Sequence, residues 1–207
     1  ALHNVANALA AAAITYAHGV SVENIRQGLR TFSTAFFQAP GRLNVFDEHP
    51  FRVIVDYAHN PAAFKAMRDL VLKLRANYPR TLGVLSAPGD RRDEDICEDG
   101  QIAAAMFDLL VLKEDDDRRG RAPGVVAEML RSAALEAGMR PEQIVTVLDE
   151  REAVRHAMGL AQPGELLVIF ADNITAVWKE VINHPDKTPY GAARPGPSGR
   201  ARGAEMA

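Results

Sequence analysis

Five short apolar runs, separated by segments with helical periodicity, predict an α/β protein with a mostly parallel sheet of about five or six strands. The runs are residues 53–55, 82–85, 109–112, 144–148 and 166–170. They are continuous rather than alternating, which is typical of strands that are buried on both faces. We therefore expect helices on both faces of this sheet and two further helices before its first strand.

Two helices are expected within residues 1–32. Asn4 is a suitable N-cap for an Ala-rich helix that ends near Gly19, because glycine readily adopts the left-handed backbone at a helix end. Ser21 is a suitable cap for a second helix. That helix would carry three apolar side chains on one side, namely Ile25, Leu29 and Phe32.

Further helix signals follow the apolar runs. Asn60 and Pro61 form a typical cap and first-turn pair, and the apolar stripe behind them comprises Phe64, Met67, Leu70, Val71 and Leu74. Later helices are expected through residues 102–106, from Pro123 to Gly138, after the capping-box-like pair Asp149 and Glu152, and over residues 174–182. Parallel strands need long crossover connections, which are usually helices, so helices between consecutive strands fit a parallel sheet.

The composition limits the classes of function. The 207 residues suit one domain over 1–182, with 1–32 as a helical lead-in and 183–207 as a flexible tail rich in Pro, Gly, Arg and Ala. The net charge of −3 is unlike that of a nucleic-acid-binding protein, and no apolar stretch reaches the length of a membrane span. Cys97 is the single cysteine, so no internal disulfide can form. We expect a cytoplasmic protein with no nucleic-acid or membrane partner; its oligomeric state stays open.

Polar residues near the start of the chain suggest a nucleotide site. Asn4 and Asn7 are three residues apart at a helix start, and their amides can read the edge of a purine. Arg42 follows the turn at Pro40-Gly41, where a guanidinium can hold a phosphate. Simpler roles also fit, because Asn4 can be a cap and Arg42 an ordinary surface residue.

Three polar residues follow the first apolar run. Asp56 stands at the carboxyl end of the expected strand, where an aspartate can accept hydrogen bonds from ribose hydroxyls. His59 and Asn60 stand at the following helix start and could contact a base or a phosphate. A capped turn without ligand is the alternative.

Two charged loops follow the next strands. The residues of interest in them are Asp90, Arg91, Glu114, Asp115, Asp116 and Arg118. Charge runs are usually solvated, but loops of mixed sign at the ligand-binding edge of a sheet suit a zwitterionic amino acid.

The order and spacing of these segments resemble the C-terminal lobe of the Mur ligase family, which includes peptidoglycan-precursor ligases and folylpolyglutamate synthetase. The matching segments are His3-Asn4-x-x-Asn7, Gly41-Arg42, Asp56-Tyr-Ala-His59-Asn60-Pro61 and Gly89-Asp90-Arg91, and the resemblance covers roughly residues 1–180. The two charged loops resemble most the cyanophycin synthetase branch of the family. The resemblance implies an α/β lobe of an ATP-dependent amide ligase, in which an amine attacks an acyl phosphate.

The resemblance also implies roles for individual residues. The implied nucleotide-binding residues are Asn4 and Asn7 at the adenine, Asp56 at the ribose, His59 and Asn60 beside the nucleotide, and Arg42 near the phosphates. Arg42 is also the implied catalytic clamp. The implied amino-acid-binding residues are Asp90, Arg91, Glu114, Asp115, Asp116 and Arg118. In cyanophycin synthetases the incoming amino acid is arginine and the acceptor is a polyaspartate polymer, and acidic side chains suit a guanidinium.

Some features of the family are absent from this sequence. The phosphate loop and the main Mg²⁺ ligands belong to a preceding central domain of these ligases, so we expect upstream domains as partners, no metal ligands here, and no ligation by this chain alone. No Asn-Pro-Arg motif follows Asp115, and Phe170-Ala171-Asp172-Asn173 replaces a Gly-Lys-Gly-type element. Two alternatives remain: a catalytically silent structural or polymer-binding module, and a folylpolyglutamate- or peptidoglycan-type ligase lobe.

Overall fold

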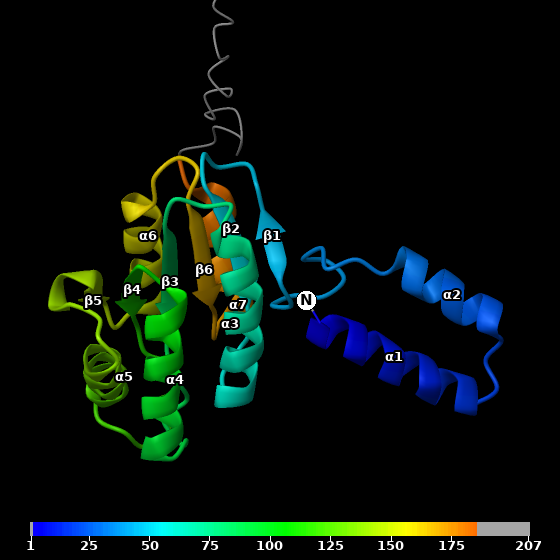
Figure 1. Cartoon of the computed structure of the whole chain (residues 1–207), viewed down its shortest axis with the longest axis horizontal. Coiled ribbons are helices and arrows are strands. Elements are labelled where there is room, and N and C mark those ends of the chain that lie inside the picture. The colour runs from blue at the N-terminus through cyan, green and yellow to red at the C-terminus, as the bar shows by residue number, and fades with distance from the viewer. Residues whose placement is uncertain (1, 186–207) are drawn as a thin grey trace, which may run out of the picture.

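A six-stranded sheet with helices on both faces forms the centre of the molecule (Figure 1). The computed structural model describes residues 2–185, and for Leu2 and His3 only the backbone. The expected tail, 183–207, lies almost entirely outside these residues. The strands are β1 Asn44–Phe46, β2 Arg52–Asp56, β3 Thr81–Leu85, β4 Leu109–Leu112, β5 Ile144–Thr146 and β6 Leu166–Phe170, in the spatial order β1-β2-β6-β3-β4-β5. All neighbours pair in parallel except β1, which is antiparallel to β2.

The helices are α1 Leu2–Ala17, α2 Val22–Thr31, α3 Pro61–Arg75, α4 Asp93–Met106, α5 Val125–Glu136, α6 Glu150–Leu160 and α7 Ile174–Asn183, with a short 3₁₀ turn at Pro141–Gln143. One apolar core lies between the sheet and α3, α4 and α5, and includes Phe64, Ile96 and Leu130. A second core lies on the opposite face, against α6 and α7. The predicted α/β fold with a covered, mostly parallel sheet is therefore confirmed.

Local signals explain why the elements begin where they do. The side chain of Asn60 accepts a hydrogen bond from the backbone N–H of Ala63 at 3.0 Å, and Pro61 occupies the first turn of α3. The side chain of Asp149 accepts one from the N–H of Glu152 at 2.8 Å and so caps α6. All five residues of β3 and all five of β6 are buried, as their continuous apolar runs predict.

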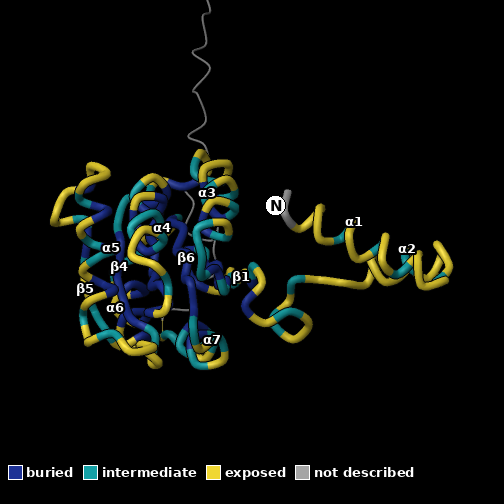
Figure 2. Tube along the Cα trace, turned by 90° about the horizontal axis from the view of Figure 1, so that it is seen from below, coloured by how far each residue is buried: buried dark blue, intermediate teal, exposed yellow. Residues whose placement is uncertain are grey.

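Helices α1 and α2 form a hairpin that projects from the sheet (Figure 1). We call Leu2–Thr31 the hairpin and residues 41–183 the sheet domain. Figure 2 shows that the hairpin is mostly exposed whereas the strands are buried. No residue of α2 is buried, and the exposed apolar residues of the hairpin are Val5, Leu9, Ile14, Tyr16, Val22 and Leu29. None of the helices in residues 2–185 is long and apolar enough to cross a membrane.

Several sequence expectations need correction. Asn4 lies inside the first turn of α1 and does not cap it, because the helix already begins at Leu2. Helix α5 begins at Val125, after the left-handed Gly124 (φ 86°), and not at Pro123. Strand β5 ends at Thr146, although the N–H of Val147 still bonds to the carbonyl of Leu112.

Strand β1 was not expected from the sequence. It has only three residues, too few to show a period, and its place depends on tertiary contacts. Asn44 is fully buried there; its amide oxygen accepts from the N–H of Gly41 at 2.6 Å and its NH₂ donates to the carbonyls of Thr34 and Ala39. These hydrogen bonds tie the chain before β1 to the edge of the sheet.

Candidate functional site

The parallel strands β2, β6, β3 and β4 are neighbours and end at one edge of the sheet, so the loops that follow them meet there. These loops carry most of the candidate residues. The hollows at this edge are a cleft between α1 and the sheet domain and a smaller pocket directly above the strand ends.

The cleft has a volume of about 440 Å³. It is lined by Asn4 and Asn7 from α1, Arg42 and Leu43 from the turn before β1, Asp56 from the end of β2, and Ala63, Ala66 and Met67 from α3. Four of the six predicted nucleotide-binding residues thus lie around one space, although they come from three separate segments of the chain. Their roles towards a ligand stay predictions.

The wall formed by Arg42 and Asp56 is fixed by backbone contacts. One carboxylate oxygen of Asp56 accepts the N–H of Leu43 at 2.9 Å, and the carbonyl of Gly41 accepts the N–H of Tyr57 at 2.9 Å. The guanidinium of Arg42 lies 5.9 Å from the centre of the Tyr57 ring, within reach of a cation–π contact. The turn is therefore joined to the end of β2.

Glycine at position 41 is favoured by the conformation of the backbone. Its φ is 69°, in the left-handed region that glycine adopts without steric cost. A Cβ atom there would also lie 2.6 Å from Cδ1 of Ile174, so the end of the Ile174 side chain would have to move to make room for it.

The other two predicted nucleotide residues lie apart from the cleft lining. The amide oxygen of Asn60 is used as the cap of α3. His59 lines the smaller pocket, where its Nδ1 lies 2.8 Å from the carbonyl oxygen of Tyr57. The structure thus divides the segment 56–60 between two sites, which a linear motif does not reveal.

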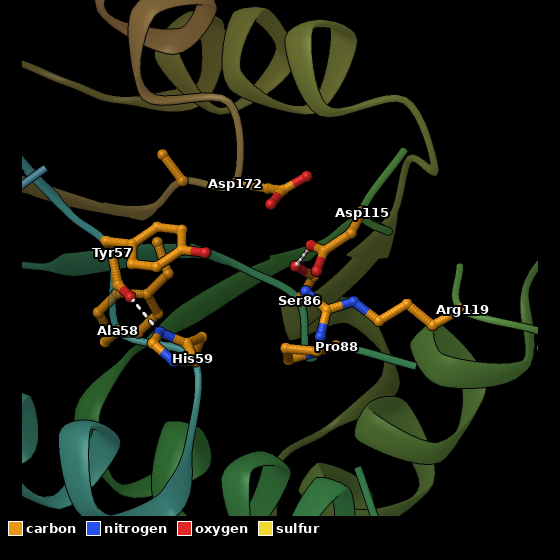
Figure 3. A pocket seen from close by; sticks show the side chains of 10 residues that line it. Tyr57, Ala58, His59, Ser86, Pro88, Asp115, Arg119 and Asp172 are labelled. Carbon is orange, nitrogen blue, oxygen red and sulfur yellow. Dashed lines mark hydrogen bonds between the residues drawn. The ribbon is translucent and has the colours of Figure 1, made fainter. Parts of the chain in front are cut away.

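The smaller pocket lies above the ends of β2, β3, β4 and β6 (Figure 3). It is lined by Tyr57, Ala58, His59, Ser86, Pro88, Asp115, Arg119, Phe170, Ala171 and Asp172. Its volume of about 10 Å³ is room for about one water molecule, so a larger guest requires the loops to move apart. Figure 3 shows Arg119 reaching towards Ser86 and Pro88, with Asp115 beside Ser86 and with Tyr57 and His59 on the opposite side of the pocket.

Two acidic side chains, Asp115 and Asp172, line this pocket and make it electronegative. Asp115 is held by the hydroxyl of Ser86, while Asp172 follows β6. Burial raises the pKa of Asp172, and the negative charge of Asp115 raises it further. A cationic guest between the two carboxylates would remove this repulsion.

The predicted amino-acid-binding residues do not all converge on the pocket. Asp115 lines it, and Asp90 reaches it indirectly, because both its oxygens accept from Arg119 Nη1 at 2.9 Å. Glu114 is buried and fully engaged within its own loop, with Arg118 Nε at 3.0 Å and the N–H of Gly124 at 2.8 Å. These contacts give Glu114 and Arg118 a structural role in the loop after β4.

Arg91 and Asp116 are the remaining two members of that set. The Nε atom of Arg91 is buried without a hydrogen-bond partner among the described residues. Its carbonyl oxygen accepts from Arg121 Nη2 at 2.7 Å, which joins the two charged loops. Asp116 is exposed beside the pocket, close enough to raise the pKa of Asp172. Neither residue is in the pocket lining.

Sequence reasoning missed several residues at this edge. Ser86, Arg119 and Asp172 line the pocket, and behind them the buried Lys113 pairs with Glu150 at 2.9 Å. Each of these residues follows a strand or begins a helix, which is a weak signal by itself. Among the described residues, no group of three or more His, Cys, Asp or Glu side chains could hold a metal ion.

Comparison with known proteins identifies the family of this chain. The profile of the family "Mur ligase, glutamate ligase domain" matches residues 41–173, which is most of the sheet domain. The chain belongs to this family. A cyanophycin synthetase from Crocosphaera subtropica is 42% identical over 171 residues, covering 83% of this chain and 19% of that protein.

Other relatives of this Mur ligase family domain act on different substrates. UDP-N-acetylmuramoyl-L-alanyl-D-glutamate–2,6-diaminopimelate ligase from Corynebacterium glutamicum is 33% identical over 171 residues, covering 80% of this chain and 31% of that protein. The chain therefore spans only a fraction of the length of its curated relatives.

Solved structures share the fold. UDP-N-acetylmuramate–alanine ligase from Thermotoga maritima matches with a TM-score of 0.61 at 18% identity, over 87% of this chain and 37% of that one. The bifunctional folylpolyglutamate synthase/dihydrofolate synthase from Yersinia pestis, solved with AMPPNP and a Mn ion, matches with a TM-score of 0.58 at 23% identity, over 80% and 35% respectively.

Proposed function

We propose that this chain is the nucleotide-closing and amino-acid-binding lobe of an ATP-dependent acid–amino acid ligase. The observation that carries the proposal is the single cleft lined by Asn4, Asn7, Arg42 and Asp56. Asparagine amides donate and accept, as a purine edge requires, and the Asp56 carboxylate can accept from ribose hydroxyls. The Yersinia pestis enzyme that shares the fold was solved with AMPPNP, which is in keeping with a nucleotide as the ligand proposed here.

In the proposed reaction, ATP phosphorylates a carboxylate to give an acyl phosphate. The amine nitrogen of the second substrate then attacks the acyl carbon; a C–N bond forms, the C–O bond to phosphate breaks, and the amine loses a proton. Arg42 would stabilise the charge on the transferring phosphoryl group. Mg²⁺, held mainly by upstream domains, would neutralise the charge on the phosphates. Closure of the cleft would exclude water from the acyl phosphate.

The small pocket is the proposed site for the incoming amino acid. Asp115 and Asp172 would bind a cationic group, and a guanidinium suits paired carboxylates because of its planar fork. Together with the similarity to cyanophycin synthetases, this favours arginine as the amine and the β-carboxylate of a polyaspartate chain as the acceptor. The loop that carries Arg119 would have to open to admit the guest.

Replacement of Asp56 tests the nucleotide site. We expect Asp56→Ala to weaken binding of an ATP analogue, measured by isothermal titration calorimetry, while the protein keeps a cooperative thermal melt. Thr81→Ala, which removes a buried hydrogen-bonding side chain at the amino end of β3 and outside the cleft lining, is the control that should lose stability instead. Unchanged affinity of Asp56→Ala would contradict the proposed role of Asp56.

The substrate is tested by ADP release from the longer protein that contains this lobe, supplied with single amino acids and a β-aspartyl acceptor polymer. Stimulation by arginine alone supports the cyanophycin reaction. Stimulation by glutamate would indicate a folylpolyglutamate-type ligase. No turnover with any amine would favour a silent structural or polymer-binding module.

A further inference from the structure

A fully buried lysine lies behind the small pocket. Lys113, the residue after β4, has no exposed surface, and its ammonium lies 2.9 Å from Glu150 Oε1. It also donates to Ser86 Oγ at 3.0 Å and lies 3.5 Å from Asp115 Oδ1. A buried charge is costly unless it is paired, so these contacts offset the cost of burying the Lys113 ammonium.

Glu150 connects this lysine to the opposite wall of the pocket. It is the first residue of α6, and its carboxylate is almost fully buried. Oε1 accepts the backbone N–H of Asp172 at 2.7 Å, and Oε2 accepts that of Asn173 at 2.9 Å. Charge-assisted hydrogen bonds of this kind are stronger than neutral ones. The turn from β6 to α7, and with it the Cα of Asp172, is therefore fixed by Glu150.

The charges in this network leave the pocket acidic. Lys113 and Glu150 neutralise each other, and Asp90 neutralises Arg119. The carboxylates of Asp115 and Asp172 remain, at the ends of β4 and β6 on either side of β3. Asp115 lies 3.5 Å from the Lys113 ammonium, and the backbone N–H of Asp172 donates to Glu150, so both are held by the same buried pair. A neutral guest would leave this negative charge uncompensated, whereas a cationic guest would balance it.

We propose that Lys113 and Glu150 are positioning residues that hold Asp115 and Asp172 at the pocket and thereby set its preference for a cationic amino acid. The inference rests on the proposed function, because it takes the pocket as the amino-acid site. Neither residue touches the guest; both act through the two aspartates and the backbone of the β6–α7 turn.

A double variant tests this role without leaving an unpaired charge in the interior. Glu150→Gln alone would strand the Lys113 ammonium, which is strongly destabilising. Lys113→Met with Glu150→Gln removes both charges and keeps the side-chain volumes similar, so the domain is expected to fold. It loses the charge-assisted bonds to the turn at Asp172, because a glutamine has only one side-chain oxygen to accept them.

Arg80 and Glu165 provide a matched control. They form another ion pair, in which Glu165 is buried and Arg80 is partly exposed, with Arg80 Nε 2.7 Å from Glu165 Oε1, just before β3 and β6 begin. This pair lies at the amino ends of the strands, away from the pocket. Arg80→Met with Glu165→Gln therefore removes a similar pair without affecting Asp115 or Asp172.

The measurement is an NMR titration of each protein with L-arginine and with L-citrulline, which replaces the guanidinium by a neutral urea of the same shape. For the unchanged protein we expect arginine to bind better and to shift the signals of Ser86, Asp115 and Asp172. The Lys113/Glu150 variant should lose about tenfold in arginine affinity, and the preference over citrulline should shrink. The Arg80/Glu165 control variant should keep the arginine affinity and the preference for arginine over citrulline.

Two other outcomes would contradict different parts of the proposal. If the Lys113/Glu150 variant retains the arginine affinity and the preference of the unchanged protein, the positioning role is wrong while the pocket assignment stands. If the unchanged protein shows no preference for arginine over citrulline, the assignment of the pocket to a cationic amino acid is wrong, and this inference fails with it.

Discussion

The hairpin and the sheet domain differ sharply in how their apolar residues are covered. Val53, Leu82 and Val168 in the sheet have no exposed surface, whereas Leu9 in α1 is 67% exposed. The cleft nevertheless takes Asn4 and Asn7 from the hairpin and Asp56 from the sheet. The apolar burial is therefore concentrated in the sheet domain, and one wall of the cleft lies on an element with little burial of its own.

The largest expected contrast is between two apolar truncations. Phe64→Ala in α3 should lower the free energy of unfolding by about 3–5 kcal/mol, because it leaves a cavity in the core. Leu9→Ala in the hairpin should change it by less than about 0.5 kcal/mol. Urea denaturation followed by circular dichroism measures both. An equally large loss for Leu9→Ala would show that the hairpin is packed as tightly as the sheet domain.

The second prediction concerns how the stability of the sheet domain depends on pH through one buried acid, Asp99. Asp99 in α4 is fully buried, and neither carboxylate oxygen has a hydrogen-bond partner among the described residues. Its pKa is raised to about 7, chiefly by burial and also by the negative charges of Glu98 and Asp95, while the positive charges of Arg91 and Lys65 oppose the shift.

The folded protein therefore keeps the proton of Asp99 at a pH where the unfolded chain has lost it. The stability that this group contributes is present near pH 4, falls as the pH rises towards 7, and is absent above that; the loss is on the order of 4 kcal/mol. Asp99→Asn, which imitates the neutral acid, should be more stable than the unchanged protein at pH 8 and similar at pH 4. Thermal melts across this range measure the difference. Equal melting temperatures at pH 8 would contradict the buried, protonated acid.

A smaller loss is expected from Gly89→Ala, at the contact between the two charged loops. A Cβ atom there would lie 2.1 Å from the carbonyl oxygen of Arg118, and the Gly89 carbonyl accepts from Arg121 at 2.6 Å. We expect a loss of about 1–3 kcal/mol, measured by denaturation. Asp90→Ala, which removes only an exposed ion pair from the same loops, should cost far less.

The smallest effects compare two exposed helix glycines with open space around them, Gly159 in α6 and Gly28 in α2. Alanine is the better helix former by about 0.5–1 kcal/mol. Gly159→Ala should raise the global stability by that amount. Gly28→Ala should instead slow amide hydrogen exchange in α2 and leave global unfolding unchanged. A global gain from Gly28→Ala would show that the hairpin and the sheet domain unfold together.

Much of the fold follows from local patterns. The apolar runs at 82–85 and 166–170 predict β3 and β6, and Asn60 and Asp149 predict the starts of α3 and α6. These signals are strong because a strand buried on both faces needs a continuous apolar run and a helix start needs a side-chain acceptor. Strand β1 has no such apolar run. Its position depends instead on the hydrogen bonds of the buried Asn44 amide.

The candidate site was only partly predictable. The ordered motifs carried the resemblance that selected Asn4, Asn7, Arg42 and Asp56, and the structure brings these four residues to one cleft. The charged loop after β4 was less informative, because a run of charges does not show which side chains are buried. Glu114 turns into its own loop, and Asp115 faces the pocket.

The sequence by itself determined the alternation of strands and helices and the caps of α3 and α6, because these depend on neighbours a few residues apart, and the order of its motifs indicated the family. Only the tertiary structure decided that Lys113 is buried against Glu150 and that Glu150 holds the turn at Asp172. Those contacts join residues far apart in the chain, across four strand and helix ends. The reason is physical: a buried charge must find its partner wherever the packed strands place it, and no local pattern records that partner.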